Sequence, residues 1–213
     1  MRRAGPLTGS QRGIVLVHGR GGSAADILGL MHQATLPDVA AIAPEAPGAT
    51  WWPSSFLAPH AQIEPHVHRG VTAVMRAVAV LEAEGIPRHA IWLGGFSQGA
   101  CLALESYARA GDGLAGVFAF SGGLVGTADT GGPEEDALYS HMPKRFDYPG
   151  RRDGGKVWLS VHASDPHIPL RRAEDTAAVL AAMGAEVAKT IYPGTGHSVM
   201  REDLAQMRHW LGA

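Results

Sequence analysis

The fold is decided by the stretch Ile91-Trp92-Leu93-Gly94-Gly95-Phe96-Ser97-Gln98-Gly99-Ala100-Cys101-Leu102. Its first half is a continuous apolar run that predicts a buried strand over Ile91–Gly95, and its second half opens a segment that predicts a helix over Gln98–Ala110. The Gly-x-Ser-x-Gly pattern between them is typical of a nucleophile elbow, in which a sharp strand-to-helix turn exposes a serine. The same letters also occur by chance in glycine-rich turns, and it is the strand-to-helix context that favours the elbow.

On both sides of this stretch, apolar runs alternate with helical patterns. Such alternation predicts an α/β fold with a mainly parallel central sheet and helices on both faces. Further strands are expected at Gly13–Val17, Val39–Ala43, Gly116–Phe120, Lys156–His162 and Val187–Tyr192. Further helices are expected at Ala24–Ala34, Ile63–Glu84, Arg171–Met183 and Arg201–Leu211. Two stretches, 46–60 and 124–155, match neither pattern and are expected to be binding loops.

Length and composition narrow the class of protein. A chain of 213 residues is expected to form one domain, 1–213, that buries about 70 to 75 % of its unfolded surface. The net charge is −2 and the basic residues are scattered, so nucleic acid is not an expected partner.

The single cysteine, Cys101, cannot form an intramolecular disulfide, which fits a reducing compartment. Residues 1–12 lack the apolar centre of a signal peptide and no run is long enough to span a bilayer. We therefore expect a cytoplasmic protein without membrane insertion and leave a homodimer open.

A serine hydroxyl needs a base within hydrogen-bonding reach, and that base needs a third group to orient it. His197 follows the turn Pro193–Gly196 after the last expected strand, which places it at the carboxyl edge of the sheet. Asp165 follows another strand at the same edge, whereas its rival Asp175 lies within an expected helix. The sequence positions of four other histidines fit a base less well: His18, His162, His167 and His209.

The same chemistry requires two donors that stabilise the negative oxygen of a tetrahedral intermediate. The backbone amide of Gln98 is the first candidate. The glycine loop His18–Gly22 after the first expected strand supplies the second, with the amide of Arg20 preferred and that of Gly21 next. This loop lacks the glycine patterns of phosphate-binding loops, so nucleotide binding is not expected.

Four motifs occur in order along the chain: Val17-His18-Gly19-Arg20-Gly21-Gly22, Gly95-Phe96-Ser97-Gln98-Gly99, Asp165-Pro166-His167-Ile168-Pro169 and Gly196-His197. Together they resemble the phospholipase/carboxylesterase family of the α/β-hydrolase superfamily, which includes acyl-protein thioesterases. The resemblance implies an α/β-hydrolase fold with a small cap loop and hydrolysis of a small-molecule ester or thioester without a cofactor, and no metal is expected. It also implies a triad of Ser97, Asp165 and His197, with oxyanion amides at Arg20 and Gln98.

The aromatic stretch 51–59 looks most like small bacterial carboxylesterases of this family. We expect Trp51, Trp52, Phe56 and Leu57 to line the substrate pocket, because aromatic side chains offer large rigid apolar surfaces. A plain packing role stays open for one of the two tryptophans. The segment 124–155 is expected to cap the pocket and to contribute Tyr139, His141, Met142 and Phe146. The side chain of Arg20 either attracts an anionic substrate or points into solvent.

The sequence thus predicts a serine carboxylesterase that works through an acyl-enzyme on Ser97. Alternatives within enzymes are a thioesterase or lysophospholipase and a cyclic-ester hydrolase. A dienelactone-type enzyme would present a cysteine in place of Ser97. The alternative from another class is a non-catalytic ligand-binding protein of the same fold, which predicts a defective triad.

Overall fold

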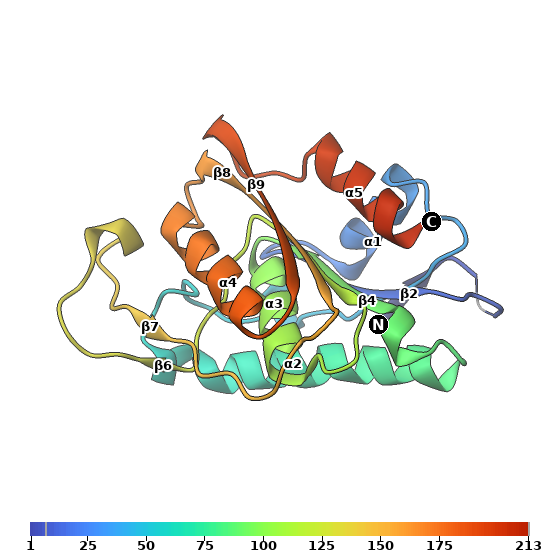
Figure 1. Cartoon of the computed structure of the whole chain (residues 1–213), viewed down its shortest axis with the longest axis horizontal. Coiled ribbons are helices and arrows are strands. Elements are labelled where there is room, and N and C mark those ends of the chain that lie inside the picture. Colours follow the sequence, from blue (N-terminus) through green and yellow to red (C-terminus); the bar gives the residue numbers. More distant parts are fainter. Residues whose placement is uncertain (7, 213) are drawn as a thin grey trace.

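The computed structural model describes residues 1–6 and 8–212, and its centre is a seven-stranded sheet (Figure 1). The strand order is β1-β3-β2-β4-β5-β8-β9, and all neighbours are parallel except β1 and β3. The strands are β1 (Arg2–Ala4), β2 (Gly13–Val17), β3 (Ala40–Ala43), β4 (Ile91–Phe96), β5 (Gly116–Phe120), β8 (Lys156–Ser164) and β9 (Glu186–Thr195). The predicted α/β class with a mainly parallel sheet is confirmed.

Five helices cover the sheet: α1 (Ala24–Gln33), α2 (His60–Ala83), α3 (Gln98–Ala110), α4 (Leu170–Ala182) and α5 (Arg201–Leu211). Side chains along a strand alternate between the two faces. In β2, Val15 and Val17 belong to the core under α2, α3 and α4, whereas Ile14 and Leu16 belong to the core under α1 and α5 (Figure 1). Both faces of the sheet are therefore buried, which explains why its strands read as solid apolar runs.

Some elements have no counterpart among those predicted. Strand β1 is only three residues long and largely exposed, so it carries no apolar alternation. The stretch 46–60 contains one short 3-10 turn, Pro47–Ala49. The stretch 124–155 contains the two-stranded sheet β6 (Ala128–Asp129) and β7 (Lys144–Arg145) and the turn Asp136–Leu138.

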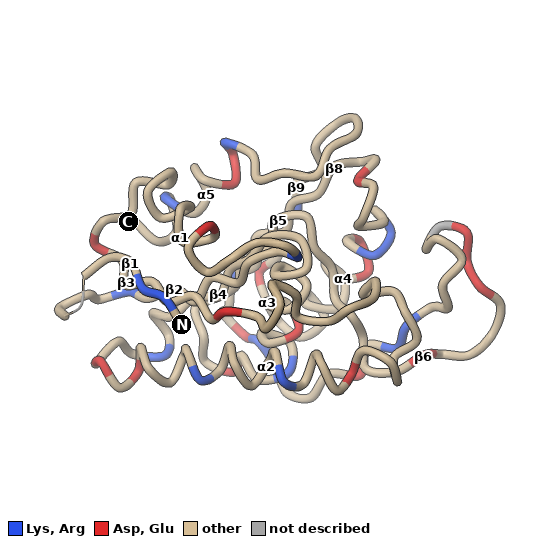
Figure 2. Tube along the Cα trace, turned by 180° about the vertical axis from the view of Figure 1, so that it is seen from behind, with Lys and Arg blue, Asp and Glu red and all other residues tan. Residues whose placement is uncertain are grey.

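The charged residues form no stripe of one sign. Figure 2 shows lysine, arginine, aspartate and glutamate distributed over the whole trace. No helix within residues 1–6 and 8–212 combines the length and the apolar character needed to cross a membrane.

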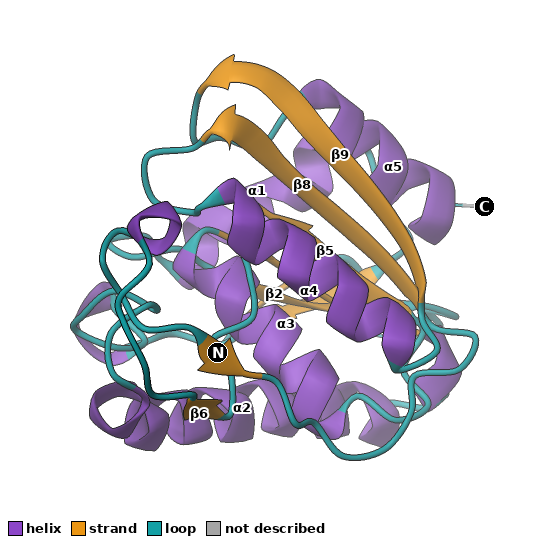
Figure 3. Cartoon of the chain, turned by 60° about the vertical axis from the view of Figure 1, so that its left-hand side comes forward, coloured by secondary structure: helices purple, strands orange, loops and turns teal. Residues whose placement is uncertain are grey.

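The order of the strands places the site. The chain passes from β2 to β3 on one side and later returns to add β4 on the other side, so β2 and β4 mark a topological switch point. Ligands of open α/β sheets bind at the carboxyl ends of the strands at such a point. The glycine loop 18–22 follows β2 and Ser97 follows β4. Strands β8 and β9, which extend past the rest of the sheet in Figure 3, carry Asp165 and His197 beyond their carboxyl ends.

Candidate active site

Ser97 occupies a strained turn between β4 and α3. Its φ of 56° and ψ of −123° lie outside the regions that L-residues prefer. The turn is held by the amide of Ser97, which donates to the carbonyl of Phe120 at 2.9 Å. A Cβ on Gly95 would overlap the carbonyl of Gly99, and a Cβ on Gly99 would overlap the carbonyl of Val17. Both glycines are therefore required by close backbone approach, and such stored strain is characteristic of functional positions.

His197 links Ser97 to Asp165. The Nε2 atom of His197 lies 2.8 Å from Oγ of Ser97, and its Nδ1 lies 2.9 and 3.0 Å from the two carboxylate oxygens of Asp165. If Nδ1–H donates to the carboxylate, Nε2 is left as an acceptor for the serine hydroxyl. The structure thus brings three residues that are far apart in the sequence into one hydrogen-bonded chain.

The Asp165 side chain is buried and well supplied with donors. Besides His197, it accepts hydrogen bonds from the amides of His167 at 2.8 Å and Ile168 at 3.0 Å. Burial alone would raise the pKa of this carboxyl group, but the hydrogen bonds from His197 and the two amides outweigh it and lower the pKa below its usual value. Asp165 is therefore held as a carboxylate against the imidazole. Asp175, by contrast, lies on α4.

The imidazole of His197 is packed on both sides. Its ring centroid lies 4.9 Å from that of Phe96 and 4.7 Å from that of His167, which approaches edge-on. The preceding Gly196 packs against the buried ring of His162, and a Cβ there would come within 2.6 Å of that ring. His162 thus packs against the loop that carries His197, and it is not one of the hydrogen-bonded residues that lead to Ser97.

The glycine loop lies directly beside Ser97, since a Cβ on Gly19 would lie 3.4 Å from the Cβ of Ser97. Within the described residues, the amides of Arg20 and Gln98 donate no hydrogen bond to another residue. The amide of Gly21 donates to the carbonyl of Ala49 at 2.8 Å. The expectation that Gly21 is the next candidate for an oxyanion donor is therefore wrong, because its amide joins two loops. The amides of Arg20 and Gln98 remain available as donors.

Two side chains hold the aromatic stretch in place, Arg20 from the glycine loop and Gln98 from the elbow, and the sequence did not suggest this function. The guanidinium of Arg20 donates to the carbonyls of Pro53, at 2.7 Å, and Ser54. The carboxamide of Gln98 donates to the carbonyl of Trp52 at 2.8 Å and accepts from the amide of Trp51 at 2.9 Å. The Arg20 side chain is exposed and lines the cleft, with its guanidinium bound to the loop at 53–54.

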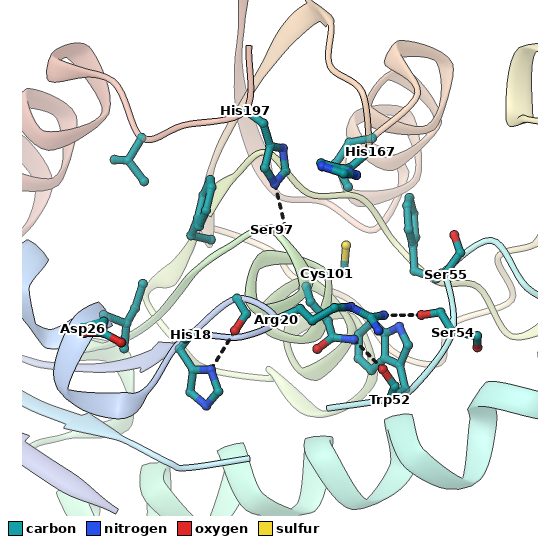
Figure 4. A pocket seen from close by; sticks show the side chains of 18 of the residues that line it. His18, Arg20, Asp26, Trp52, Ser54, Ser55, Ser97, Cys101, His167 and His197 are labelled. Carbon is teal, nitrogen blue, oxygen red and sulfur yellow. Dashed lines mark hydrogen bonds between the residues drawn. The ribbon is translucent and has the colours of Figure 1, made fainter. Parts of the chain in front are cut away.

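A cleft of about 710 Å³ opens around Ser97 (Figure 4). Its walls are formed by the loops at 18–22, 52–56, 167–168 and 197–199, by the elbow between β4 and α3, and by the start of α1. Several of the lining residues were not selected by sequence reasoning. The lining residues are His18, Gly19, Arg20, Gly22, Asp26, Ile27, Leu30, Trp52, Pro53, Ser54, Ser55, Phe56, Phe96, Ser97, Gln98, Cys101, His167, Ile168, His197 and Val199. In the described part of the chain, no three acidic, histidine or cysteine side chains are grouped to hold a metal ion.

Of the expected pocket residues, Trp52 and Phe56 line the cleft. Trp51 turns away, because its indole donates to the carbonyl of His18 at 2.9 Å, and Leu57 is fully packed in the core. No described side chain of 124–155 lines the cleft, so the expected cap is not observed in this part of the structure. His141, Met142 and Phe146, which were expected in the pocket, are therefore not among its lining residues. Tyr139 is half exposed and instead donates its hydroxyl to the carbonyl of Asp165 at 3.0 Å.

The geometry can support nucleophilic chemistry. Nε2 of His197 is within the distance needed to take the Ser97 proton as the oxygen attacks a carbonyl. Free amides next to the serine can stabilise a developing oxyanion.

Comparisons with known proteins agree with this architecture. The family model described as phospholipase/carboxylesterase matches residues 6–133, which include Ser97. Two curated relatives named acyl-protein thioesterase 1, from Gibberella zeae and Neurospora crassa, are 29 % and 30 % identical over 127 residues. That region is 60 % of this chain, and it spans about half the length of these relatives, 49 % and 47 %.

Solved structures extend the likeness over the entire chain. A phospholipase/carboxylesterase from Dyadobacter fermentans is 33 % identical, with a TM-score of 0.83 over 100 % of this chain and 95 % of its own. A Bacillus cereus carboxylesterase at 15 % identity has a TM-score of 0.72, covers 99 % of this chain and 92 % of its own, and shares the fold. Because the family model matches more than half of the chain, we conclude that this chain belongs to the phospholipase/carboxylesterase family.

Proposed function

We propose that this chain is a serine carboxylesterase that hydrolyses small carboxylic esters through an acyl-enzyme on Ser97. The observation that carries the proposal is the hydrogen-bonded chain from Ser97 through His197 to Asp165, built on a strained elbow. Membership of the family and the absence of any visible defect in these three residues favour an enzyme over a ligand-binding protein of the same fold.

The proposed cycle begins when His197 takes the proton of Ser97 as the serine oxygen attacks the acyl carbonyl. The amides of Arg20 and Gln98 stabilise the oxyanion, and the imidazolium then gives its proton to the leaving alcohol. Water, deprotonated by the same imidazole, attacks the acyl-enzyme and releases the acid. Asp165 remains a carboxylate throughout and stabilises the imidazolium.

The cleft favours small esters as substrates. Its volume of about 710 Å³ lies within the usual range of small-molecule pockets, and Ile27, Leu30, Phe56 and Val199 supply apolar walls. The proposed partner is therefore a small-molecule ester, and nucleic acid is not proposed as a partner.

The test uses the purified chain and p-nitrophenyl butyrate. Ser97→Ala is expected to lower kcat by about 10⁴ or more, because the nucleophile is lost, and a fluorophosphonate probe is expected to label Ser97 alone. Ser140→Ala, at an exposed position outside the cleft, is the control and should keep full activity. Labelling at a different serine would reject the assignment, and a probe-unreactive but ligand-stabilised protein would favour the binding function.

A thioesterase is the second candidate, favoured by the two curated relatives that carry this name. Ser97 and His197 would attack a thioester by the same steps. Matched S-butyryl and O-butyryl substrates distinguish the two candidates, because a kcat/KM at least tenfold higher for the thioester would make thioester hydrolysis the main activity.

A further inference from the structure

His167 places a second imidazole next to that of His197. Its amide is fixed by the Asp165 carboxylate at 2.8 Å, and its exposed side chain lines the cleft. The ring meets that of His197 at a centroid distance of 4.7 Å and an interplanar angle of 73°. Figure 4 shows the two rings next to each other above Ser97. No step of the proposed cycle uses this side chain.

Most polar side chains of the cleft already have hydrogen-bond partners. His18 bonds Gly19 and Ala46 through its two ring nitrogens. Arg20 and Gln98 form hydrogen bonds with the aromatic stretch. Asp26 accepts a hydrogen bond from Ser23, and Ser55 accepts one from the amide of Leu57. Within the described residues, the ring nitrogens of His167, the hydroxyl of Ser54 and the indole nitrogen of Trp52 have no such partner. Of these three groups, His167 is the one that contacts the ring of His197.

The proposed chemistry brings the alcohol part of the ester close to His167. The leaving oxygen must come within about 2.6 to 3.2 Å of Nε2 of His197 to receive its proton. The alcohol part of the ester therefore passes the imidazole of His197, whose neighbours are the apolar ring of Phe96 and the polar ring of His167. A hydrogen-bonding group on the alcohol, a few bonds from the ester oxygen, can reach His167.

We propose that His167 is a specificity-determining residue that hydrogen-bonds the alcohol part of the substrate. The preferred substrates are then esters whose alcohol carries a hydroxyl group close to the ester oxygen, such as monoesters of diols. The inference rests on the proposed esterase function and adds to it the chemical class of the leaving group.

The test compares two esters of nearly equal shape, 2-hydroxyethyl butyrate and propyl butyrate, by kcat/KM. The wild-type enzyme is expected to favour the hydroxyethyl ester by about 2- to 12-fold, which is the effect of one hydrogen bond. His167→Phe keeps a ring beside His197 and should abolish this preference, because kcat/KM for the hydroxyethyl ester should fall by about 2- to 12-fold more than kcat/KM for the propyl ester. His167→Gln, which retains a donor and an acceptor, should restore part of the preference.

The control is His89→Phe, an exposed histidine in the turn that precedes β4, which should change neither rate. An equal loss on both esters in His167→Phe would overturn the proposal, because His167 would then act by supporting His197. The proposal also fails if Ser54→Ala, rather than His167→Phe, removes the preference. If the wild-type enzyme hydrolyses neither ester nor p-nitrophenyl butyrate, the esterase function itself is rejected.

Discussion

At the scale of single residues, the orienting role of Asp165 can be isolated. In Asp165→Asn the amide oxygen can still accept from the backbone amides of His167 and Ile168, so the loop is retained. The amide group stabilises the wrong imidazole tautomer and no longer stabilises the imidazolium. We expect kcat for p-nitrophenyl butyrate to fall by about 10⁴ with an unchanged circular dichroism spectrum.

The matched control is Asp175→Asn, which removes a carboxylate from α4. Burial raises the pKa of Asp175 in spite of the opposing influence of Arg172. The fold therefore does not stabilise the charged form of this side chain, and removing the charge should disturb the protein little. Its kcat should stay within about twofold of wild type. Similar losses in the two variants would show that Asp165 acts through general electrostatics and does not orient His197.

The candidate residues could be placed from the sequence because each follows a strand. Carboxyl ends of parallel strands meet at one edge, so motifs after β2, β4, β8 and β9 must lie near one another. The direction of single side chains does not follow from this rule. Trp51 enters the core and Trp52 lines the cleft because of bonds to His18 and Gln98, which are distant in sequence.

At the scale of elements, α3 supports the long segment 124–155 through a buried carboxylate. Glu105 is fully buried, accepts from the amides of Val125 at 2.8 Å and Gly126 at 3.0 Å, and bonds Arg109 and the hydroxyl of Tyr148. Glu105→Ala would leave the amide of Val125 and the hydroxyl of Tyr148 without their acceptor, whereas Arg109 would still pair with Glu64. We expect the free energy of unfolding in urea to fall by about 3 to 5 kcal/mol.

The comparison for this prediction is Glu174→Ala on α4, which is exposed and lies 3.9 Å from Lys189. Exposed ion pairs contribute little, so its effect should stay below about 1 kcal/mol. If Glu105→Ala were no more destabilising than Glu174→Ala, the segment 124–155 would have to be held by other contacts.

The regular elements were predictable because the helices carry an apolar period and the buried strands are continuous apolar runs. The ends of α3, α5, β2 and β5 agree with the expected ranges, and the other helices and core strands differ by a few residues. Strand β1 and the course of 124–155 were not predictable, since short exposed pieces have no period. Long-range bonds hold this segment, such as that from the Lys144 ammonium to the carbonyl of Ala58 at 2.6 Å.

At the scale of the whole molecule, the single cysteine reports on the stability of the fold. Cys101 lies in the first turns of α3, between the sheet and the Gly123 amide, and only 1 % of it is exposed. Burial is the main cause that raises the pKa of its thiol to about 12. At pH 8 only about one thiol in 10⁴ is then a thiolate, which is the form that reacts with disulfide reagents.

Native protein at pH 8 should therefore react with Ellman's reagent far more slowly than protein in 6 M guanidinium chloride, where the thiol regains an ordinary pKa of about 8.5. If reaction requires opening of the fold, its rate follows the equilibrium population of the open form. Glu105→Ala should then raise the rate of thiol labelling by about 100-fold or more, because the variant is less stable. Asp165→Asn and Ser97→Ala should raise this rate much less. Rapid labelling of the native wild-type protein would contradict this prediction and would mean that the reagent reaches Cys101 through the cleft that the thiol helps to line.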